Sequence, residues 1–471
     1  MLLTMKVVRK ELPNRSEQQR KEISTICKYI LFLTVTFLPV IWVGCKKNTP
    51  EVEVNDIVLD KTYLSLAKEM NAIITAKISP YAAADTPVDW ESSNPAVATV
   101  TNGKVEAKAY GTVVITAKAG NQTTTCSVTV KPAIIGVYYF DGWSGTNRHA
   151  LNPNEPWAAN APTHLSKRFV QEFPEREPIW GWRNDSQDIM ERQIDLAAGN
   201  GVDFFLYCWY WKNDRGALNE AAIKSDSKHT SLDLYLKAKN KKKIQYSLLI
   251  ANHSGAEILG GDNWDAAVKY WAQYFRDPQY LTVDGKPLVV IFGTSDEAIN
   301  DSEIARMQES AVKAGFKDGL AIAGCGGNAK RKAFTHTTHY NVIPGYSAGS
   351  EEHNFQELID ATKSQWIGRE DQPYIPLLTS GWDKRPWEGP DGLDQVEGWY
   401  FTGDTPYSFK SFLNDAITWM DYNPTKTTKE RLTLIYAWNE LGEGGYLVPT
   451  KGDPEAAKLK KIGELLKERS K

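Results

Sequence analysis

LIYAWNELGEGGYLVP, residues Leu434–Pro449, is the stretch around which the rest of the chain can be interpreted. Its first residues are apolar and aromatic, as in a strand that is buried on both faces. The stretch then becomes a glycine-rich loop with two carboxylates three residues apart, Glu440 and Glu443. Such a pair can supply the acid and base catalysis that cleavage of a glycosidic bond needs. A solvated acidic turn is the alternative, but the flanking Trp438 and Tyr446 favour a site, because exposed acidic turns seldom carry aromatic residues on both sides.

The composition narrows the function classes. A chain of 471 residues is long enough for two or three domains, and a net charge of −3 gives no sign of a nucleic-acid partner. Its 16 Trp and 21 Tyr residues are many, and aromatic rings stack on the apolar faces of sugars, although any one of them serves equally well as core. The five Cys residues are too scattered for a disulfide framework. No C-x-x-C or H-E-x-x-H spacing occurs, so neither a metal site nor a cofactor is expected.

The first 45 residues are typical of an exported protein. A basic segment precedes the apolar run Tyr29–Val43, which is too short to span a bilayer comfortably, and Gly44 then precedes Cys45. This order resembles a bacterial lipoprotein signal, which implies lipidation of Cys45 and a membrane-anchored protein in the periplasm or on the cell surface. A plain signal peptide or an anchor helix remain as alternatives. Residues 46–53 are then a polar tether.

Residues 54–131 favour a small all-β sandwich. Short β-rich runs alternate with turn residues, and Asn102-Gly103 is a strong hairpin signal. The runs are Ile57–Leu59, Ile73–Ile78, Val97–Val100, Val113–Ala117 and Cys126–Val130. The segment also resembles the bacterial Ig-like domain of group 2, through Trp90, Ser92-Ser93-Asn94-Pro95, Gly103-Lys104-Val105 and Gly111. This resemblance implies a spacer or adhesion module without chemistry of its own.

Residues 132–471 alternate between apolar runs and helical periodicity, which predicts a parallel (β/α)8 TIM barrel. The expected strands are Ile134–Phe140, Val202–Trp209, Ile244–Ile250, Leu288–Phe292, Leu320–Gly324, Asn341–Gly345, Tyr374–Thr379 and Leu432–Trp438. Helices are expected between them at Gln187–Asn200, Trp264–Phe275, Phe355–Trp366 and Phe409–Met420.

In such a barrel the residues that follow the strands converge on one mouth, where active sites of this fold lie. Besides the two glutamates, the expected substrate-binding residues are Asp141, Trp143, Trp209, Trp211, His253, Tyr346, Trp382, Asp383 and Asn439. This aromatic, carboxylate-rich set suits a glycan better than a phosphate, because the chain has no glycine-rich phosphate loop.

Each of these residues also has a structural interpretation. His253 could simply bond a loop carbonyl, and Asp383 could cap a turn together with Arg385. Trp209 and Trp211 lie on one face of a strand and could belong to the core, although one of the two is expected to face the mouth.

Four motifs from Met190 onward resemble the WbsX-like family, which is also described as endo-α-mannosidase-like. They are MERQIDLAAGNGVDFFLYCWYW (Met190–Trp211), TSGWDKRPW (Thr379–Trp387), TPYSFKSFL (Thr405–Leu413) and AWNELGEGGYLVP (Ala437–Pro449). The endo-α-mannosidases carry a similar N-E-x-x-E-G segment, which this chain matches at Asn439 to Gly444. The chain differs from that pattern at Leu441 and Val448, where the family usually has Trp and Glu.

The resemblance implies a retaining glycoside hydrolase that works through a 1,2-anhydro sugar. By position, Glu440 would be the base on the sugar 2-hydroxyl, and Glu443 would protonate the leaving oxygen and then activate water. We therefore expect a raised pKa at Glu443. Two other functions remain: a sugar transferase of polysaccharide synthesis, because the family name carries that label, and a non-catalytic glycan-binding lipoprotein. Nothing indicates the oligomeric state.

Overall fold

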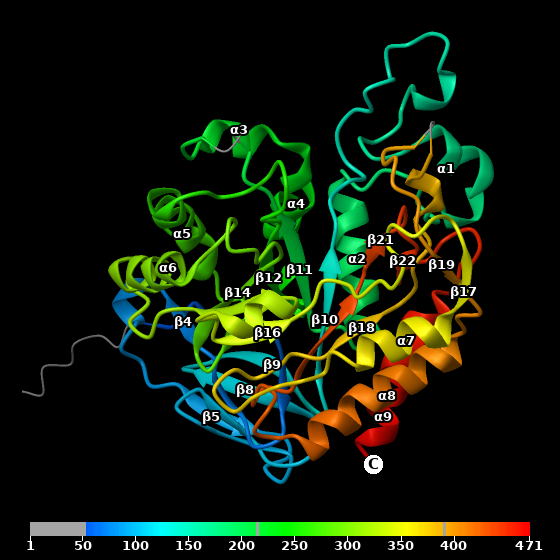
Figure 1. The fold of residues 1–471 in the computed structure, drawn as a ribbon. Coiled ribbons are helices and arrows are strands. Elements are labelled where there is room, and N and C mark those ends of the chain that lie inside the picture. Colours follow the sequence, from blue (N-terminus) through cyan, green and yellow to red (C-terminus); the bar gives the residue numbers. More distant parts are fainter. Residues whose placement is uncertain (1–52, 213–215, 390–391) are drawn as a thin grey trace, which may run out of the picture. The chain divides into compact units, whose positions relative to one another are not determined.

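The structure is a computed structural model that describes residues 53–212, 216–389 and 392–471 (Figure 1). The predicted signal peptide and its lipidation site, Cys45, lie outside the described residues. Within the described ranges, no helix combines the length and the apolar character that crossing a membrane requires.

The first part is an all-β sandwich, as the sequence predicted. Its strands form a four-stranded sheet in the order β2-β9-β8-β5, a three-stranded sheet β3-β7-β6, and the pair β1-β4. Residues alternate between the inside and the outside along these strands, so that Val113, Ile115 and Ala117 of β8 point into the core. The strands are β1 (Asp56–Leu59), β2 (Tyr63–Ala67), β3 (Asn71–Ile73), β4 (Ala76–Ser79), β5 (Asp89–Ser92), β6 (Ala98–Thr101), β7 (Lys104–Ala107), β8 (Gly111–Ala119) and β9 (Gln122–Lys131).

The hairpin predicted at Asn102-Gly103 is confirmed. Thr101 of β6 pairs with Lys104 of β7, and the two turn residues have φ angles of 48° and 78°. A two-residue turn with both φ values positive matches the twist of the flanking strands, and glycine adopts such values without strain. The single run expected at Ile73–Ile78 is instead two strands, β3 and β4, which belong to different sheets.

The second part is the predicted parallel barrel. In the described chain, eight strands follow the order β16-β15-β14-β12-β11-β10-β20-β18, and every neighbouring pair in that order is parallel. A parallel bridge between Thr337 and Tyr374 brings the two ends together. The strands are β10 (Ile134–Tyr139), β11 (Phe204–Trp209), β12 (Gln245–Ile250), β14 (Lys286–Ile291), β15 (Ala321–Cys325), β16 (His336–Thr338), β18 (Leu377–Thr379) and β20 (Leu432–Tyr436).

The sixth strand is misplaced in the sequence prediction. Asn341–Gly345 was expected to be a strand, but the strand is β16, and Asn341–Gly345 belongs to the loop that follows it. His336–Thr338 is short and polar, so no apolar run in the sequence marks it. It is a strand because it pairs with β15 and because Thr337 forms a bridge with Tyr374. The mouth of the barrel therefore receives a longer segment from this side, which begins at His339.

Helices surround the strands (Figure 1). All four predicted helices are present, and α5 shows why the pattern was readable: Trp264, Val268, Trp271 and Phe275 recur at helical spacing and are all buried. The helices are α1 (Lys167–Glu172), α2 (Gln187–Gly199), α3 (Glu220–Ser225), α4 (Thr230–Lys237), α5 (Gly261–Phe275), α6 (Asp301–Lys313), α7 (Phe355–Lys363), α8 (Pro406–Tyr422) and α9 (Ala457–Arg469).

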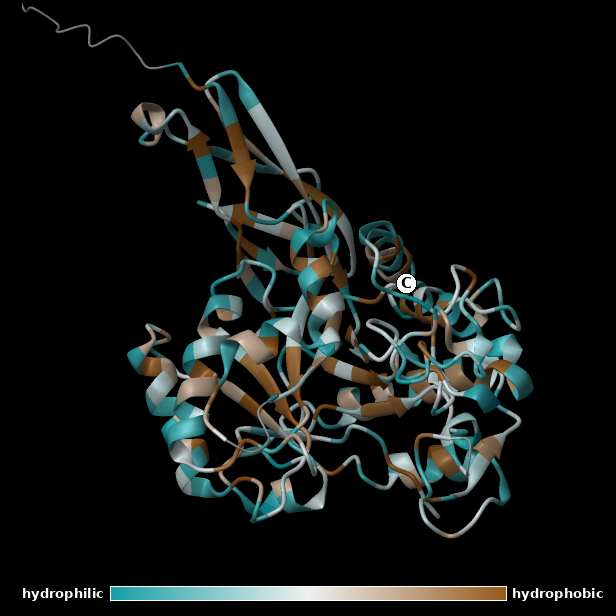
Figure 2. Cartoon of the chain, turned by 90° about the horizontal axis from the view of Figure 1, so that it is seen from above, coloured by the Kyte–Doolittle hydropathy of each residue, from teal (hydrophilic) through white to brown (hydrophobic). Residues whose placement is uncertain are grey.

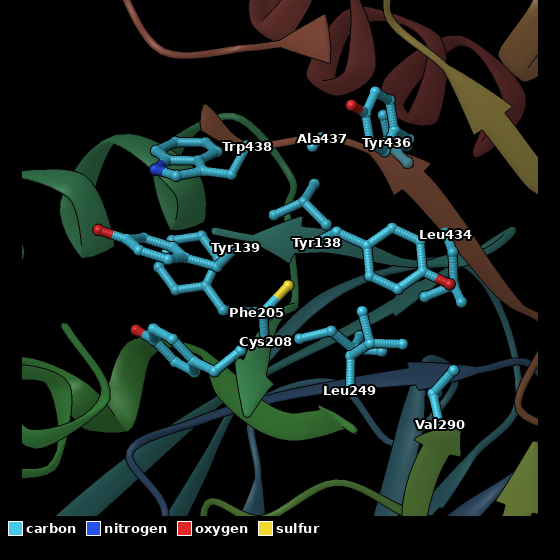
Figure 3. Close-up of a cluster of buried hydrophobic side chains, with 14 of the residues drawn as sticks. Tyr138, Tyr139, Phe205, Cys208, Leu249, Val290, Leu434, Tyr436, Ala437 and Trp438 are labelled. Atoms are coloured by element: carbon cyan, nitrogen blue, oxygen red, sulfur yellow. The ribbon is translucent and has the colours of Figure 1, made fainter. Parts of the chain in front are cut away.

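The barrel core is continuous and aromatic. Every residue of β10 and β11 is buried, which is typical of parallel strands that have helices on one side and a filled interior on the other. Figure 2 shows this as brown strands among mainly teal and white helices. In Figure 3, Trp438, Tyr139 and Phe205 gather on one side of the cluster, with 5.1 Å between the ring centroids of Trp438 and Phe205. Gln193 of α2 accepts hydrogen bonds from Trp438 Nε1 (2.7 Å) and from the Tyr139 hydroxyl (3.1 Å), so this side faces the helices.

The joint between the two parts is short. β9 ends at Lys131 and β10 begins at Ile134. The buried Lys131 ammonium pairs with Asp203 Oδ1 at 2.7 Å and donates to the Gly201 carbonyl at 3.0 Å. The other oxygen of Asp203 accepts from the Ile135 N–H at 2.7 Å. This ion pair therefore fixes the entry of the chain into its first barrel strand.

Candidate active site

A cavity of about 690 Å³ lies where the carboxyl ends of the parallel strands meet. Both conspicuous glutamates line it, so the predicted pair is at the mouth and not in an outer turn. Its wall consists of Phe140, His164, Cys208, Tyr210, Lys228, Leu249, Ala251, His253, Ser254, Phe292, Tyr340, Asn341, Ile343, Tyr346, Trp382, Trp387, Glu440 and Glu443.

The loop that carries the glutamates is fixed to the segment after β10 by hydrogen bonds between side chains and main-chain groups. The amide of Asn439 accepts from the Phe140 N–H and donates to the Phe140 carbonyl, both at 2.8 Å. Trp143 Nε1 donates to the Asn439 carbonyl at 2.8 Å. Asn439–Glu440 (β21) then pairs with Gly445–Tyr446 (β22), which closes the loop on itself. The carboxylate of Glu440 therefore enters the cavity from a rigid backbone.

Two glycines of this loop are required by close approach. A side chain at Gly442 would meet the Trp387 ring at 2.0 Å. Gly444 has a φ of 79°, and a Cβ there would lie 2.5 Å from the Asp383 nitrogen. The glycine pattern of the sequence thus reflects tight packing of this loop against the loop that follows β18.

Each glutamate accepts a hydrogen bond from a tyrosine, the buried Tyr436 or the partly buried Tyr340. The hydroxyl of Tyr340 donates to Glu440 Oε1, and that of Tyr436 donates to Glu443 Oε2. Glu440 Oε2 is buried and has no hydrogen-bond partner among the described residues. A buried acceptor without a donor is costly, so this oxygen has the capacity to accept a hydrogen bond from a group that enters the cavity.

Burial raises the pKa of both carboxyl groups. The pKa of Glu443 rises to about 7, because desolvation outweighs the hydrogen bond from Tyr436 and the charge of Lys384, both of which lower it. The pKa of Glu440 is raised well above its usual range by desolvation and, in addition, by the charge of Glu443. The expectation that one of the pair would be raised, and that it would be Glu443, is therefore too narrow. Near neutral pH the pair holds at least one proton.

Three of the predicted binding residues line the cavity with the glutamates: His253, Tyr346 and Trp382. Trp382 is buried, and its ring centroid lies 6.0 Å from that of Tyr346. His253 is exposed at the rim, and its Nδ1 lies 3.0 Å from the Ser254 carbonyl. His253 therefore both contacts a loop carbonyl and lines the cavity, so the two interpretations of this residue are compatible.

Asp141, Trp143 and Asn439 lie behind the wall rather than in it. Asp141 is buried and accepts from the Ser144 hydroxyl (2.6 Å) and from the Ser231 N–H, which anchors the long loop after β10 to the start of α4. Burial raises its pKa to about 6. Trp143 and Asn439 are occupied by the backbone contacts described above. These three residues position the site and do not line it, contrary to the prediction.

Neither Trp209 nor Trp211 lines the cavity, contrary to the prediction that one of the two faces the mouth. Trp209 stacks on His229 with 5.5 Å between ring centroids and meets Trp271 of α5 edge-on at 5.3 Å. Because side chains alternate along a strand, Cys208 and Tyr210 point to the cavity instead. Burial raises the pKa of the Cys208 thiol well above its usual range, so that it stays protonated.

Asp383 is paired and is not part of the wall. Arg176 and Arg385 both form ion pairs with its carboxylate, the latter with its Nε at 2.8 Å from Oδ1. Its main-chain nitrogen donates to the Glu443 carbonyl at 2.7 Å. The structural interpretation, a turn held together with Arg385, is the one that the geometry supports.

The sequence reasoning missed Tyr340, Tyr436, Trp387 and Lys228. Tyr436 lies in the stretch Leu434–Pro449 and Trp387 in the motif Thr379–Trp387, and only their side-chain direction was unknown. Tyr340 was hidden because the sixth strand was placed at Asn341–Gly345. Lys228 lies 19 residues beyond β11 and gave no signal.

A second hollow of about 610 Å³ adjoins this cavity and shares His253 and Ser254 with it. It lies over the carboxyl ends of β12, β14 and β15, and its wall is polar, with Glu257, Glu297 and Asn328 among its residues. No group of three or more His, Cys, Asp or Glu side chains in the described ranges is arranged to hold a metal ion.

Comparison with solved structures gives several long, distant matches. Two endo-α-mannosidase structures from Bacteroides thetaiotaomicron are 15% and 14% identical, each over 71% of this chain and 96% of theirs, with a TM-score of 0.45. A protein described as glycoside hydrolase-like is 14% identical over 71% of this chain and 94% of its own, with a TM-score of 0.47.

The sandwich has its own relatives. An Ig-like virion protein of Serratia phage KSP90 is 40% identical over 83 residues, which are 17% of this chain and 32% of that protein. The chain thus spans about a third of the length of this curated relative. The family profile of the bacterial Ig-like domain (group 2) matches residues 53–130.

A second family profile, described as Glycosyltransferase WbsX, matches residues 181–458, from the segment before α2 through the carboxylate loop into α9. This match covers more than half of the chain and includes both glutamates of the cavity. The protein therefore belongs to the WbsX family and carries a bacterial Ig-like domain of group 2 ahead of its barrel.

Proposed function

We propose that the protein is a carbohydrate-active enzyme, a retaining glycoside hydrolase that acts on an oligosaccharide or polysaccharide with Glu440 and Glu443 as its acid/base pair. The observation that carries the proposal is the pair itself: the buried Glu440 and the partly buried Glu443 both have raised pKa values, and both lie on the wall of an aromatic cavity at the carboxyl ends of the barrel strands. Membership in a family named for sugar transfer supports the carbohydrate part of the proposal.

The aromatic wall suits a sugar ring. Four aromatic residues line the cavity: Trp382, Trp387, Tyr346 and Phe140. Sugar rings have apolar faces that pack on such surfaces, while their hydroxyl groups need polar partners. The glutamates and Asn341 supply polar groups on the same wall.

In the first step, Glu440 removes the proton of the sugar 2-hydroxyl as O2 attacks the anomeric carbon. The glycosidic bond breaks, and Glu443 gives its proton to the leaving oxygen. In the second step, Glu443 takes a proton from water, which opens the 1,2-anhydro ring at the anomeric carbon, and Glu440 returns its proton to O2. Configuration at the anomeric carbon is retained because it is inverted twice.

This scheme needs one proton on the two carboxyl groups. A pKa of about 7 leaves Glu443 able to donate at neutral pH. Glu440 must be ionised when it acts. Its free Oε2 would accept the 2-hydroxyl of the substrate, and a donor to the ionised form lowers the pKa of the carboxyl group. Substrate binding thus favours the arrangement with the proton on Glu443.

The test is a glycan screen with the full chain, in which products are identified by mass spectrometry and the anomeric configuration by NMR. We expect shorter glycans with retained configuration, and loss of this activity in Glu440→Gln. Inverted products, or cleavage by both Glu→Gln variants at the rate of the unchanged chain, would overturn the assignment. Tight glycan binding without any cleavage would favour the binding-lipoprotein alternative.

A sugar transferase is the second candidate, favoured by the family description. The same pair would then pass the sugar to an acceptor hydroxyl instead of water. Incubation with nucleotide sugars and with glycan donors, each with and without an acceptor sugar, separates the two functions. Product formation only from a nucleotide sugar would identify the transferase.

We further propose that the protein is exported and anchored through a lipid on Cys45. The support is the order of basic segment, Tyr29–Val43, Gly44 and Cys45 in the sequence. Cys45→Ser should move the protein from the membrane fraction to the soluble fraction. Membrane fractionation that stays unchanged, with the leader removed, would contradict the lipid anchor.

A further inference from the structure

Lys228 is a cation that the proposed chemistry does not use. Among the described residues, it is the one lysine or arginine in the wall of the cavity. Its Nζ lies 4.1 Å from the centroid of the Tyr210 ring, which lines the same cavity. No ion pair joins it to a carboxylate in the described part of the chain. Asp226, the nearest acidic residue in the sequence, raises the pKa of this ammonium through its charge but forms no ion pair with it.

The backbone holds this lysine in place. Lys228 lies in the single 3-10 turn Ser227–His229, and Asp226 caps that turn by accepting from the Lys228 N–H at 3.1 Å. The buried ring of His229 bridges two segments, with Nδ1 at 2.9 Å from the Ile223 carbonyl and Nε2 accepting from the Tyr210 N–H at 3.1 Å. His229 therefore holds Lys228 and the Tyr210 ring in a fixed arrangement, which a lysine on an open surface would not have.

The Lys228 ammonium can donate more hydrogen bonds than the described residues accept from it. It carries three N–H donors, and a contact with a ring face satisfies only part of its charge. Burial lowers the pKa of Lys228, which shows that the site disfavours the charge when the cavity is empty. His164, its neighbour on the wall, adds no charge near neutral pH, because burial lowers its pKa to about 4.

Charge is also distributed unevenly over the wall. Glu440 and Glu443 follow β20, whereas Lys228 follows β11, and β10 lies between these strands. The cation that lowers the pKa of Glu443 is Lys384, which has its own partner in Asp394 at 2.8 Å. Lys228 is thus free to serve a ligand, since it is needed neither for the glutamates nor for an ion pair in the described chain.

We propose that the cavity recognises an anionic glycan, in which a carboxylate or sulfate group of one sugar binds the Lys228 ammonium. The inference rests on the proposed function only in that the cavity is taken to be a glycan site. An acidic sugar suits this wall because its ring faces stay apolar and can pack on Tyr210 or Trp387, while its charged group projects from the ring edge toward Lys228.

The experiment measures binding in the full chain that carries Glu440→Gln, so that no substrate is consumed. Affinity electrophoresis compares matched polymers: polygalacturonate with its methyl ester for the carboxylate, and dextran sulfate with dextran for the sulfate. A panel of further neutral and acidic glycans covers other backbones. Each polymer is tested again with Lys228→Met and Lys228→Arg added.

We expect an acidic glycan to bind more tightly than its neutral counterpart, and Lys228→Met to weaken that binding about ten- to hundredfold. Lys228→Arg should retain most of it. The control is Lys461→Met, because Lys461 also lies over a tyrosine ring, Tyr407 at 4.6 Å, but outside the cavity. Melting curves check that each variant is folded.

Binding of neutral glycans only, no binding of any acidic glycan, or unchanged binding in Lys228→Met would each overturn the inference. Failure of the proposed hydrolysis would look different. The unchanged chain would then bind the acidic glycan with the same dependence on Lys228 but would not cleave it.

Discussion

Two acidic loops meet at the mouth of the barrel, and the pKa values of their carboxyl groups are shifted in opposite directions. After β18, Asp383 is enclosed by Arg176 and Arg385, which hold its pKa below the usual range although burial opposes them. After β20, Glu440 and Glu443 have tyrosine hydroxyls as partners and no arginine, and burial raises the pKa of both. Burial raises the pKa of all three carboxyl groups, and the two arginines beside Asp383 reverse this effect at that residue alone.

The loop after β18, which carries the ion-paired Asp383, supports the loop after β20, which carries the two glutamates. Arg176 also donates to the Leu441 carbonyl at 3.1 Å, and the Asp383 nitrogen donates to the Glu443 carbonyl at 2.7 Å. Leu441 and Glu443 belong to the loop that carries the glutamates. An ion pair that is stable at neutral pH therefore fixes the backbone of two carboxyl groups whose charged forms are disfavoured by burial.

The largest effect is expected for Glu440→Gln. The amide keeps the shape of the side chain but cannot accept the proton of the sugar 2-hydroxyl. We expect the rate to fall about 10²–10⁴-fold, with glycan binding largely preserved. The rate of release of reducing ends from the glycan found in the screen measures it. Glu397→Gln is the matched control, because Glu397 is exposed and outside the cavity, and it should change little.

Glu443→Gln should lower the rate for natural glycans by a similar factor, because the leaving oxygen is no longer protonated. An activated aryl glycoside needs little protonation, so its cleavage should be partly restored in this variant and not in Glu440→Gln. The ratio of rates for aryl and natural substrates measures the difference. Equal restoration in the two variants would show that the roles of the glutamates are wrongly divided.

The sequence predicted the barrel and the glutamates, but not this contrast between the two loops. Strand alternation, the spacing of Glu440 and Glu443 and the glycines around them are local patterns, and these were readable. Whether Asp383 pairs with Arg176 depends on two segments that are 207 residues apart. The same holds for Tyr340 and Glu440, which are 100 residues apart. Contacts of this range decide protonation, and they have no local signal.

The prediction that Trp209 or Trp211 faces the mouth was wrong for a different reason. Alternation shows that Trp209 and Trp211 share a face, but it does not show which face is inside the barrel. In a strand that is buried on both sides, helix packing and the barrel interior both demand large apolar residues. Composition alone therefore cannot assign Trp209 to the helices and Cys208 to the cavity.

Asp383→Asn should destabilise the fold by about 3 kcal/mol at neutral pH, because it leaves the buried Arg176 without its anion. The pKa of Asp383 is lowered in the folded state, so its contribution is present above the unfolded pKa of about 3.9 and is lost as the pH falls through the folded value. The difference in unfolding free energy between this variant and the unchanged chain should therefore shrink in acid. Urea unfolding at several pH values measures it.

The control for this prediction is Asp371→Asn. Asp371 pairs with Arg369 at 3.0 Å on the surface, where both side chains are more than half exposed, so the loss should stay below about 1 kcal/mol. Equal effects of the two variants would show that Asp383 is not the support of the neighbouring loop. Activity should fall only in Asp383→Asn, since that variant alone loosens the backbone of Glu443.

The smallest effect is expected for Tyr436→Phe, which removes the hydrogen bond to Glu443 and leaves the ring in place. A hydroxyl that donates to a carboxylate stabilises the anion and lowers the pKa, so its loss should raise the pKa of Glu443 above about 7. As the proton donor, Glu443 sets the alkaline limit of activity, and this limit should move up by about half to one pH unit.

Tyr340→Phe is the matched variant, because Tyr340 acts on the base Glu440, whose ionisation sets the acidic limit. There the acidic limit should move up, and the active range should narrow instead of widening. The pH dependence of kcat/KM for the two variants distinguishes these outcomes. Alkaline limits that move together, or not at all, would show that Glu440 and Glu443 do not act as separate base and acid.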